Sequence, residues 1–208
     1  MYYSNARLFG PLTLLALTVA LCATVARADN LNPPSWHGTP LGVEGHWTQP
    51  NPFNQWTVLS YNRPVPDPSE FFNLTVTPSI VQNGNAYTVN FPNWIDLEPL
   101  KIGRIQIYWL NPTSTPPGIN SITGFEGITP VPGFTTGGGA IGGLPLGTNG
   151  YFYDFFIQPN PDWEQILFTL PDGSTLSQLD INTMSIPEPA SLALLAGAGL
   201  VLLRRHSA

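Results

Sequence analysis

The chain has 208 residues, with 7 Lys and Arg residues against 13 Asp and Glu residues, so its formal net charge is −6. Only 10% of the residues are charged, far below the usual ~25% of a soluble domain. The 23 prolines exclude a coiled coil or a large helical protein, and the 42% hydrophobic residues exclude a disordered chain.

The first 28 residues have the parts of a secretory signal peptide. Arg7 supplies a positive charge, residues 8–23 form an apolar run, and Ala26 and Ala28 are the small residues that signal peptidase reads. We therefore predict export and cleavage after Ala28. A permanent N-terminal membrane anchor is the alternative, and the cleavage site argues against it.

Residues 29–186 are expected to form the ectodomain, which has the size of one domain. It carries three basic and twelve acidic residues, a net charge of −9, and it has no cysteine. Binding to nucleic acid relies on clustered Lys and Arg that displace counterions, so nucleic acid is excluded as a partner. Without cysteine, disulfides and thiolate zinc sites are excluded as well.

Short runs of β-branched and aromatic residues, separated by turn residues, predict strands throughout the ectodomain. Asn83-Gly84 lies between two such runs, 80–82 and 87–91, and predicts a β-hairpin. Further strands are expected over 55–61, 71–77, 102–110, 151–158, 166–170 and 179–186, with a turn at 171–173. We predict an all-β fold, an antiparallel β-sandwich of jelly-roll or immunoglobulin-like topology.

Residues 102–110 alternate in polarity, as a strand with one buried face does. The alternation places Ile105, Ile107 and Trp109 on one face and Arg104, Gln106 and Tyr108 on the other.

Two segments are expected to be loops because of their composition. Residues 30–53 contain five prolines, and residues 133–150 contain eight glycines. Residues 137–142 match the dinucleotide-binding pattern G-x-G-x-x-G, but Pro145 and further glycines follow where that site needs a helix. We therefore interpret the glycines as a flexible loop.

Three of the six tryptophans are candidates for carbohydrate stacking. Trp36, Trp47 and Trp94 lie in or beside Pro- and Asn-rich segments, where an indole ring could stack on a sugar ring. The alternative is that these rings cover the open edges of the sandwich. Trp56 and Trp109 lie in predicted strands and are expected in the core.

Catalytic and metal sites are less well supported. His37 and His46, with Glu44 between them, lack the spacing that directs ligands to one metal ion, so we predict surface or packing histidines. Asp154, among aromatic residues, is the best candidate for a catalytic acid, and we expect it instead to be a polar residue at the rim of the sheet. Ca²⁺ stays open as a cofactor because carboxylate and amide oxygens are its ligands, but no spacing identifies a ligand set.

The C-terminal residues have an unusual order. Pro187, Glu188 and Pro189 precede fourteen uncharged residues, 190–203, and then Arg204 and Arg205. A helix of fourteen residues spans ~21 Å at 1.5 Å per residue, short of the ~30 Å hydrocarbon core of a bilayer. The two arginines fit a cytoplasmic stop, and their long side chains can reach the headgroups. We predict a short transmembrane helix.

This order of features resembles the PEP-CTERM sorting signal of exopolysaccharide-producing Gram-negative bacteria. The resemblance covers residues 186–208, and an ordinary C-terminal anchor is the alternative. It implies processing by exosortase, a membrane transpeptidase, during a transient stay in the inner membrane. The implied domains are a signal peptide (1–28), an ectodomain (29–186) and a sorting signal (187–208).

The resemblance also implies a function. It predicts an exported, non-enzymatic protein of the cell surface or the extracellular matrix, associated with exopolysaccharide. The alternative is that the ectodomain is a carbohydrate-binding or polysaccharide-hydrolysing module that the signal only delivers.

Overall fold

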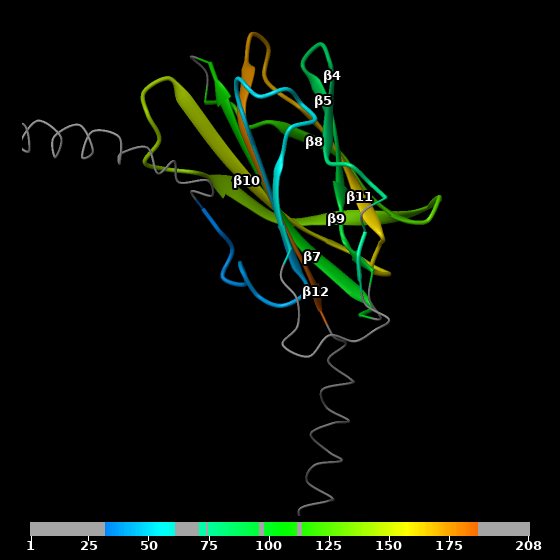
Figure 1. Ribbon diagram of the computed structural model, residues 1–208. Helices are drawn as coiled ribbons and strands as arrows, with labels where there is room; N and C mark the ends of the chain where they lie inside the picture. The colour runs from blue at the N-terminus through cyan, green and yellow to red at the C-terminus, as the bar shows by residue number, and fades with distance from the viewer. Residues whose placement is uncertain (1–31, 61–70, 74, 96–97, 112–113, 187–208) are drawn as a thin grey trace, which may run out of the picture.

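The computed structural model describes residues 32–60, 71–73, 75–95, 98–111 and 114–186 (Figure 1). These residues form twelve strands and no helix. In chain order the strands are β1 (Gly42–Thr48), β2 (Thr57–Ser60), β3 (Phe71–Phe72), β4 (Ser79–Asn83), β5 (Ala86–Pro92), β6 (Trp94–Ile95), β7 (Leu100–Leu110), β8 (Gly118–Glu126), β9 (Thr129–Ala140), β10 (Thr148–Ile157), β11 (Trp163–Thr169) and β12 (Thr175–Ile186).

The predicted signal peptide and sorting signal, residues 1–28 and 187–208, lie outside the described residues. Within the described part of the chain, no helix is long and apolar enough to cross a membrane.

Ten strands form one sheet in the order β2-β1-β12-β7-β10-β9-β8-β11-β5-β4, and β3 pairs with β6 in a separate ladder. Every pair is antiparallel. Strand β9 joins the two parts of the sheet, because residues 133–140 pair with β10 and residues 129–132 pair with β8. We call β2, β1, β12, β7 and β10 the first half-sheet, and β8, β11, β5 and β4 the second half-sheet.

The sheet curls so that the two half-sheets face each other across one hydrophobic core (Figure 1). Ile105, Ile107 and Ile181 of the first half-sheet and Val89 and Ile166 of the second are fully buried in this core. Burial of this apolar surface, worth roughly 25 cal/mol per Å², holds the half-sheets together. We call the side of each half-sheet that faces the core its interior face, and the opposite side its outer face.

The half-sheets approach closely where a glycine leaves room for a ring. A Cβ atom on Gly45 in β1 would lie 2.1 Å from Cε2 of Phe91 in β5, inside the ring's van der Waals surface. Nearby, the indole nitrogen of Trp94 donates a hydrogen bond of 3.3 Å to the carbonyl oxygen of Gly42. The absent side chain of Gly45 therefore sets the spacing of the two half-sheets at this point.

The structure confirms that the protein is all-β and antiparallel. The predicted hairpin is present, since β4 pairs with β5. Its turn lies one residue later than expected: Asn83 pairs with Ala86, so the two turn residues are Gly84 and Asn85, and Gly84 has the positive φ of 63° that the first turn position requires. The predicted β-sandwich is not confirmed: the described residues form one continuous, curled sheet, a half-barrel through which β9 runs without interruption.

Three predictions about individual segments were wrong. β1 lies within residues 30–53 and most of β9 lies within residues 133–150, both of which were expected to be loops, and β8 was not expected at all. The glycines of β9 are needed where rings lie against the backbone: a Cβ atom on Gly139 would lie 2.9 Å from Cε1 of Phe152 in β10. Of the strand expected over 71–77, only Phe71–Phe72 is a strand, β3, and the described residues 73 and 75–77 are not.

Candidate functional site: the outer face of the first half-sheet

The outer face of the first half-sheet carries a row of polar side chains across four strands. The register places Glu44 of β1 opposite Asn182 of β12, Asn182 opposite Arg104 of β7, and Arg104 opposite Asp154 of β10. Residues paired across antiparallel strands project on the same side of a sheet, so these four side chains form one row.

A second row lies one step along the strands. His46 of β1 and Asp180 of β12 are paired, with 2.5 Å between Nδ1 and Oδ1, and Gln178 donates to the second carboxylate oxygen at 2.9 Å. Asp180 is only 1% exposed. Burial raises the pKa of its carboxyl to about 6, although the hydrogen bonds from His46 and Gln178 act in the opposite direction.

The segment of residues 32–39 lies over this polar face and is bound to it by hydrogen bonds. The backbone nitrogen of Asn32 donates to Oε1 of Gln106 at 3.0 Å, and Nη1 of Arg104 donates to the carbonyl oxygen of Asn32 at 3.2 Å. Nδ1 of His37 lies 3.0 Å from Oδ1 of Asn182 and 3.5 Å from Oε2 of Glu44. The segment therefore covers Gln106, which is 0% exposed although it lies on the outer face.

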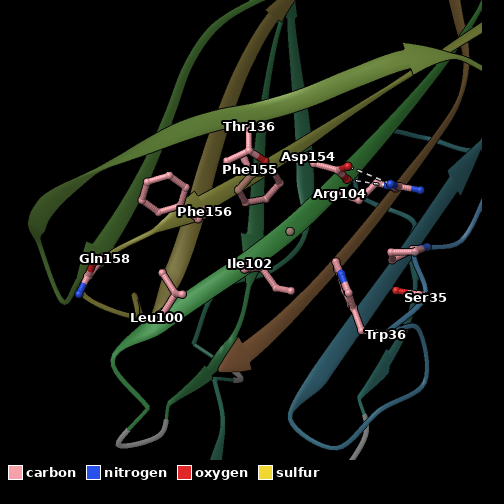
Figure 2. Close-up of a pocket in the computed structure, with 12 residues that line it drawn as sticks. Ser35, Trp36, Leu100, Ile102, Arg104, Thr136, Asp154, Phe155, Phe156 and Gln158 are labelled. Atoms are coloured by element: carbon pink, nitrogen blue, oxygen red, sulfur yellow. Dashed lines mark hydrogen bonds and ion pairs between the residues drawn. The ribbon is translucent and has the colours of Figure 1, made fainter. Parts of the chain in front are cut away.

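A cavity of about 600 Å³ opens where this segment meets β7, β9 and β10 (Figure 2). Its lining combines aromatic rings, aliphatic side chains and polar groups: Pro34, Ser35, Trp36, Leu100, Ile102, Gly103, Arg104, Thr136, Asp154, Phe155, Phe156 and Gln158. Figure 2 shows Arg104 and Asp154 toward one end of the cavity and Leu100 and Gln158 toward the other.

Arg104 and Asp154 form a two-pronged ion pair at the cavity. Nε of Arg104 lies 2.6 Å from Oδ1 of Asp154, and Nη2 lies 2.9 Å from Oδ2. The guanidinium group also lies over the ring of Phe152, 4.2 Å from its centre, a favourable position for a cation. These contacts fix both charged groups, because the planar guanidinium matches the carboxylate with two parallel hydrogen bonds.

The structure places the three candidate stacking tryptophans differently. Trp36 lines the cavity and is partly buried. Trp47 is 1% exposed, and its indole nitrogen donates to the carbonyl oxygen of Pro52 at 3.0 Å. Trp94 is 7% exposed and packs on Phe72, with 5.9 Å between ring centres. Only Trp36 of these three therefore presents its ring to the cavity.

Trp109 is in the core as expected, at 1% exposure, and Trp56 packs against the core beside Phe91, with 5.9 Å between ring centres. The remaining predicted site residues, Ala26, Ala28, Pro187, Glu188, Pro189, Arg204 and Arg205, lie outside the described residues.

His37 and His46 do not converge on a common point. Each contacts a different partner on the polar face, Asn182 and Asp180 respectively. Within the described residues, no group of three or more His, Cys, Asp or Glu side chains is arranged to hold a metal ion.

Several residues of the cavity were not singled out from the sequence. Arg104 was placed on the polar face of its strand. Asp154 was expected at the rim of the sheet, which was wrong: it lies within β10, between β7 and β9. Their pairing depends on the register between β7 and β10, because the two residues are 50 positions apart in the chain. Thr136 reaches the cavity from β9, at the register shift beside Asp154 and Phe155 of β10, and Gln158 reaches it from the position directly after β10. A sequence pattern carries no signal for that register.

Comparison of the chain with protein-family models, with curated proteins and with solved structures finds no match.

Proposed function

We propose that this chain is an exported, non-enzymatic protein of the cell surface or extracellular matrix, whose ectodomain associates with exopolysaccharide. Sorting would use the PEP motif at 187–189, the apolar run and the two arginines, with exosortase as the processing partner and the inner membrane as a transient anchor. Strand β12 ends at Ile186, directly before the motif. Processing at the motif therefore leaves every strand of the sheet in the released protein.

The observation that supports polysaccharide binding is the composition of the cavity. Sugars present apolar ring faces and many hydroxyl groups, and they need both flat apolar surface and hydrogen-bonding groups. Trp36 and Phe156 supply aromatic surface, while Gln158 and the Arg104–Asp154 pair supply polar groups. A concave, largely apolar site with a few fixed polar groups is the usual form of a small-ligand site.

The same cavity supports binding over hydrolysis. Glycoside hydrolysis ordinarily uses two carboxyl groups about 5–9.5 Å apart, one of which donates a proton. Asp154 is the one carboxylate in the cavity lining, and both of its oxygens accept hydrogen bonds from Arg104. A carboxylate held in this way is suited to orient a hydroxyl group.

We also propose that the fold is related to β-sandwiches of jelly-roll or immunoglobulin-like topology. Two half-sheets that face each other across one core support this classification, as does the antiparallel pairing of every strand. The continuous strand β9 would then represent the corner at which one sheet of the sandwich passes into the other.

Substitution of Trp36 by Ala tests the binding proposal. Polysaccharide extracted from the extracellular matrix of the producing cells is titrated into the protein, and binding is followed by calorimetry. We expect Trp36→Ala to weaken binding at least tenfold, or about 1.4 kcal/mol, because the indole face is lost from the cavity. The matched control is Trp163→Ala. Trp163 does not line the cavity, and its ring stacks on that of Phe125 with 4.0 Å between the ring centres. Equal binding by the Trp36 variant and the wild type would contradict the proposal.

A further inference from the structure

A cluster of polar side chains is buried in the interior, between the two half-sheets. Lys101 of β7, Glu164 of β11 and Asn93, which lies between β5 and β6, are all 0% exposed. Lys101 and Glu164 project from opposite half-sheets, since Lys101 shares the interior face of β7 with Ile105, and Glu164 shares that of β11 with Ile166. An amine, a carboxamide and a carboxyl are thus all fully buried in the interior.

Asn93 bridges the two half-sheets through its side chain. Its Nδ2 donates a hydrogen bond of 2.6 Å to Oε2 of Glu164, and its Oδ1 accepts one of 3.0 Å from Oγ1 of Thr183 in β12. Nδ2 also lies 3.4 Å from the carbonyl oxygen of Pro161. These bonds fix the carboxamide group in position and orientation.

The amine of Lys101 lies in the same part of the interior, near enough to Glu164 for its charge to act on the pKa of that carboxyl. Nζ of Lys101 donates to Oγ of Ser185 at 2.5 Å, and Ser185 is the residue of β12 directly opposite Lys101. Thr183, which holds Asn93, is two residues earlier on the same face, about 7 Å along the strand. The Lys101 side chain has four methylene groups, and rotation about their bonds can bring Nζ from Ser185 toward Thr183 and Asn93.

Glu164 is suited to transfer a proton. Burial raises the pKa of its carboxyl to about 8, against the opposing effects of the Lys101 charge and the hydrogen bond from Asn93. The carboxyl is therefore mainly protonated at neutral pH. Its second oxygen, Oε1, has no hydrogen-bond partner among the described residues. Burial disfavours the charged form of an amine in general, and only the neutral form has the lone pair that can attack a carbonyl carbon.

We propose that Lys101 and Asn93 join in an intramolecular amide bond, with Glu164 as the acid and base. The lone pair of Nζ attacks Cγ of Asn93, so that a bond from Nζ to Cγ forms and the carbonyl becomes tetrahedral. Oε1 of Glu164 takes a proton from Nζ, and Oε2 gives its proton to Nδ2. The tetrahedral centre collapses, the bond from Cγ to Nδ2 breaks, and one ammonia molecule leaves. Glu164 regains its starting protonation state, and no oxidant is needed.

The bond would connect the end of β5, in the second half-sheet, to β7 in the first. A protein without cysteine in its ectodomain cannot cross-link its half-sheets with disulfides, and an amide bond resists both reduction and hydrolysis outside the cell. This inference does not depend on polysaccharide binding or on the sorting signal.

Trypsin digestion of the full-length chain, purified after export and then denatured, gives a direct test. Trypsin cleaves after Lys101 and after Arg104, but a lysine whose Nζ is in an amide bond is not cleaved. We expect the fragment that contains Asn93 to end at Arg104 and to be lighter by one ammonia molecule in the mass spectrum. A fragment ending at Lys101 overturns the proposal, and this holds also if that fragment has lost ammonia through cyclisation of Asn93.

Two variants identify the group that promotes the reaction. Glu164→Gln keeps the size of the side chain and loses its proton transfer, so cleavage after Lys101 and the full mass are expected. Glu44→Gln, at a buried glutamate of the outer face, is the matched control and should keep the cross-link. A cross-linked Glu164→Gln protein would overturn the role of Glu164. The wild-type digest decides the existence of the bond even if a variant fails to fold.

Discussion

Individual side chains on the outer face of the first half-sheet derive their roles from their cross-strand partners. Arg104 is held on one side by Asp154, on another by the carbonyl oxygen of Asn32, and on its flat face by Phe152. A guanidinium with so many contacts has little rotamer freedom left to lose when a ligand binds. The cavity therefore presents a preorganised polar group, which lowers the entropic cost of association.

Glu164 gives a prediction about stability and pH. The pKa of its carboxyl is about 8 in the folded protein, against an ordinary value of 4.5, so the folded state binds the proton more tightly than the unfolded state. The free energy of unfolding gains from this tighter proton binding, and the gain is complete below about pH 4.5. It is lost as the pH rises through 8, and its size is about 1.4 kcal/mol for each unit by which the two pKa values differ. We therefore expect the midpoint temperature of thermal unfolding to decrease as the pH is raised from 5 to 8.

The matched variant for this prediction is Glu164→Gln, which does not titrate. Its thermal midpoint should change less between pH 5 and pH 8 than that of the wild type. Absence of the amide bond in this variant would lower the whole curve without changing its slope. Parallel curves for the two proteins would show that Glu164 is ionised in the folded state.

The tryptophans show how far single residues can be interpreted from sequence. Composition identified Trp36, Trp47 and Trp94 as one group, because all three are near proline or asparagine. The structure separates them, since Trp47 and Trp94 have backbone carbonyl partners in the interior, whereas Trp36 lies at the cavity. That difference arises from contacts between distant parts of the chain, which neighbouring residues do not encode.

At the scale of elements, the strands with alternating polarity were predictable and the glycine-rich strand was not. In β7, Ile105, Ile107 and Trp109 alternate with polar residues and face the core, and the turn between β4 and β5 needs a residue such as Gly84 that adopts a positive φ. β9 has neither signal, because its glycines carry no side chain to alternate. Its strand conformation comes from β10, whose rings cover the glycine backbone and replace the missing side chains.

The glycine at the contact between the half-sheets gives a prediction at this scale. Gly45→Ala places a methyl group 2.1 Å from a ring carbon of Phe91, which is fully buried, so the ring or the strand must shift. We expect a loss of ~1–3 kcal/mol in the free energy of unfolding, as for other overpacked cores, measured by urea denaturation.

Gly137→Ala is the matched control for this substitution. Gly137 also lies in a strand, but no atom lies within 4 Å of the position its Cβ would take. Its free energy of unfolding should stay within about 0.5 kcal/mol of the wild type. Equal losses in the two variants would mean that the cost comes from the alanine itself and not from the contact with Phe91.

At the scale of the whole molecule, the position of β12 connects the fold to the proposed sorting. β12 lies between β1 and β7 in the first half-sheet, and it is the last strand described. The sheet is therefore complete only when the chain has been exported as far as residue 186. A membrane anchor that begins directly after this strand would hold a finished ectodomain close to the bilayer, where a membrane-embedded processing enzyme can reach residues 187–189.

The two arginines near the C-terminus give the last prediction. The run of fourteen uncharged residues, 190–203, is short for a bilayer and contains several Ala and Gly residues, so its proposed retention would depend on the groups beside it. Each arginine costs ~2.5–3.5 kcal/mol at the bilayer centre, which in the proposed sorting would keep the C-terminus in the cytoplasm. Replacement of both Arg204 and Arg205 by Ser removes this barrier, and we expect unprocessed protein in the periplasm with its sheet still folded. Mass spectrometry of the periplasmic and surface fractions measures the outcome.

Conservative replacement of both arginines by Lys should preserve processing, and normal processing of the Ser variant would show that the basic pair has no part in sorting.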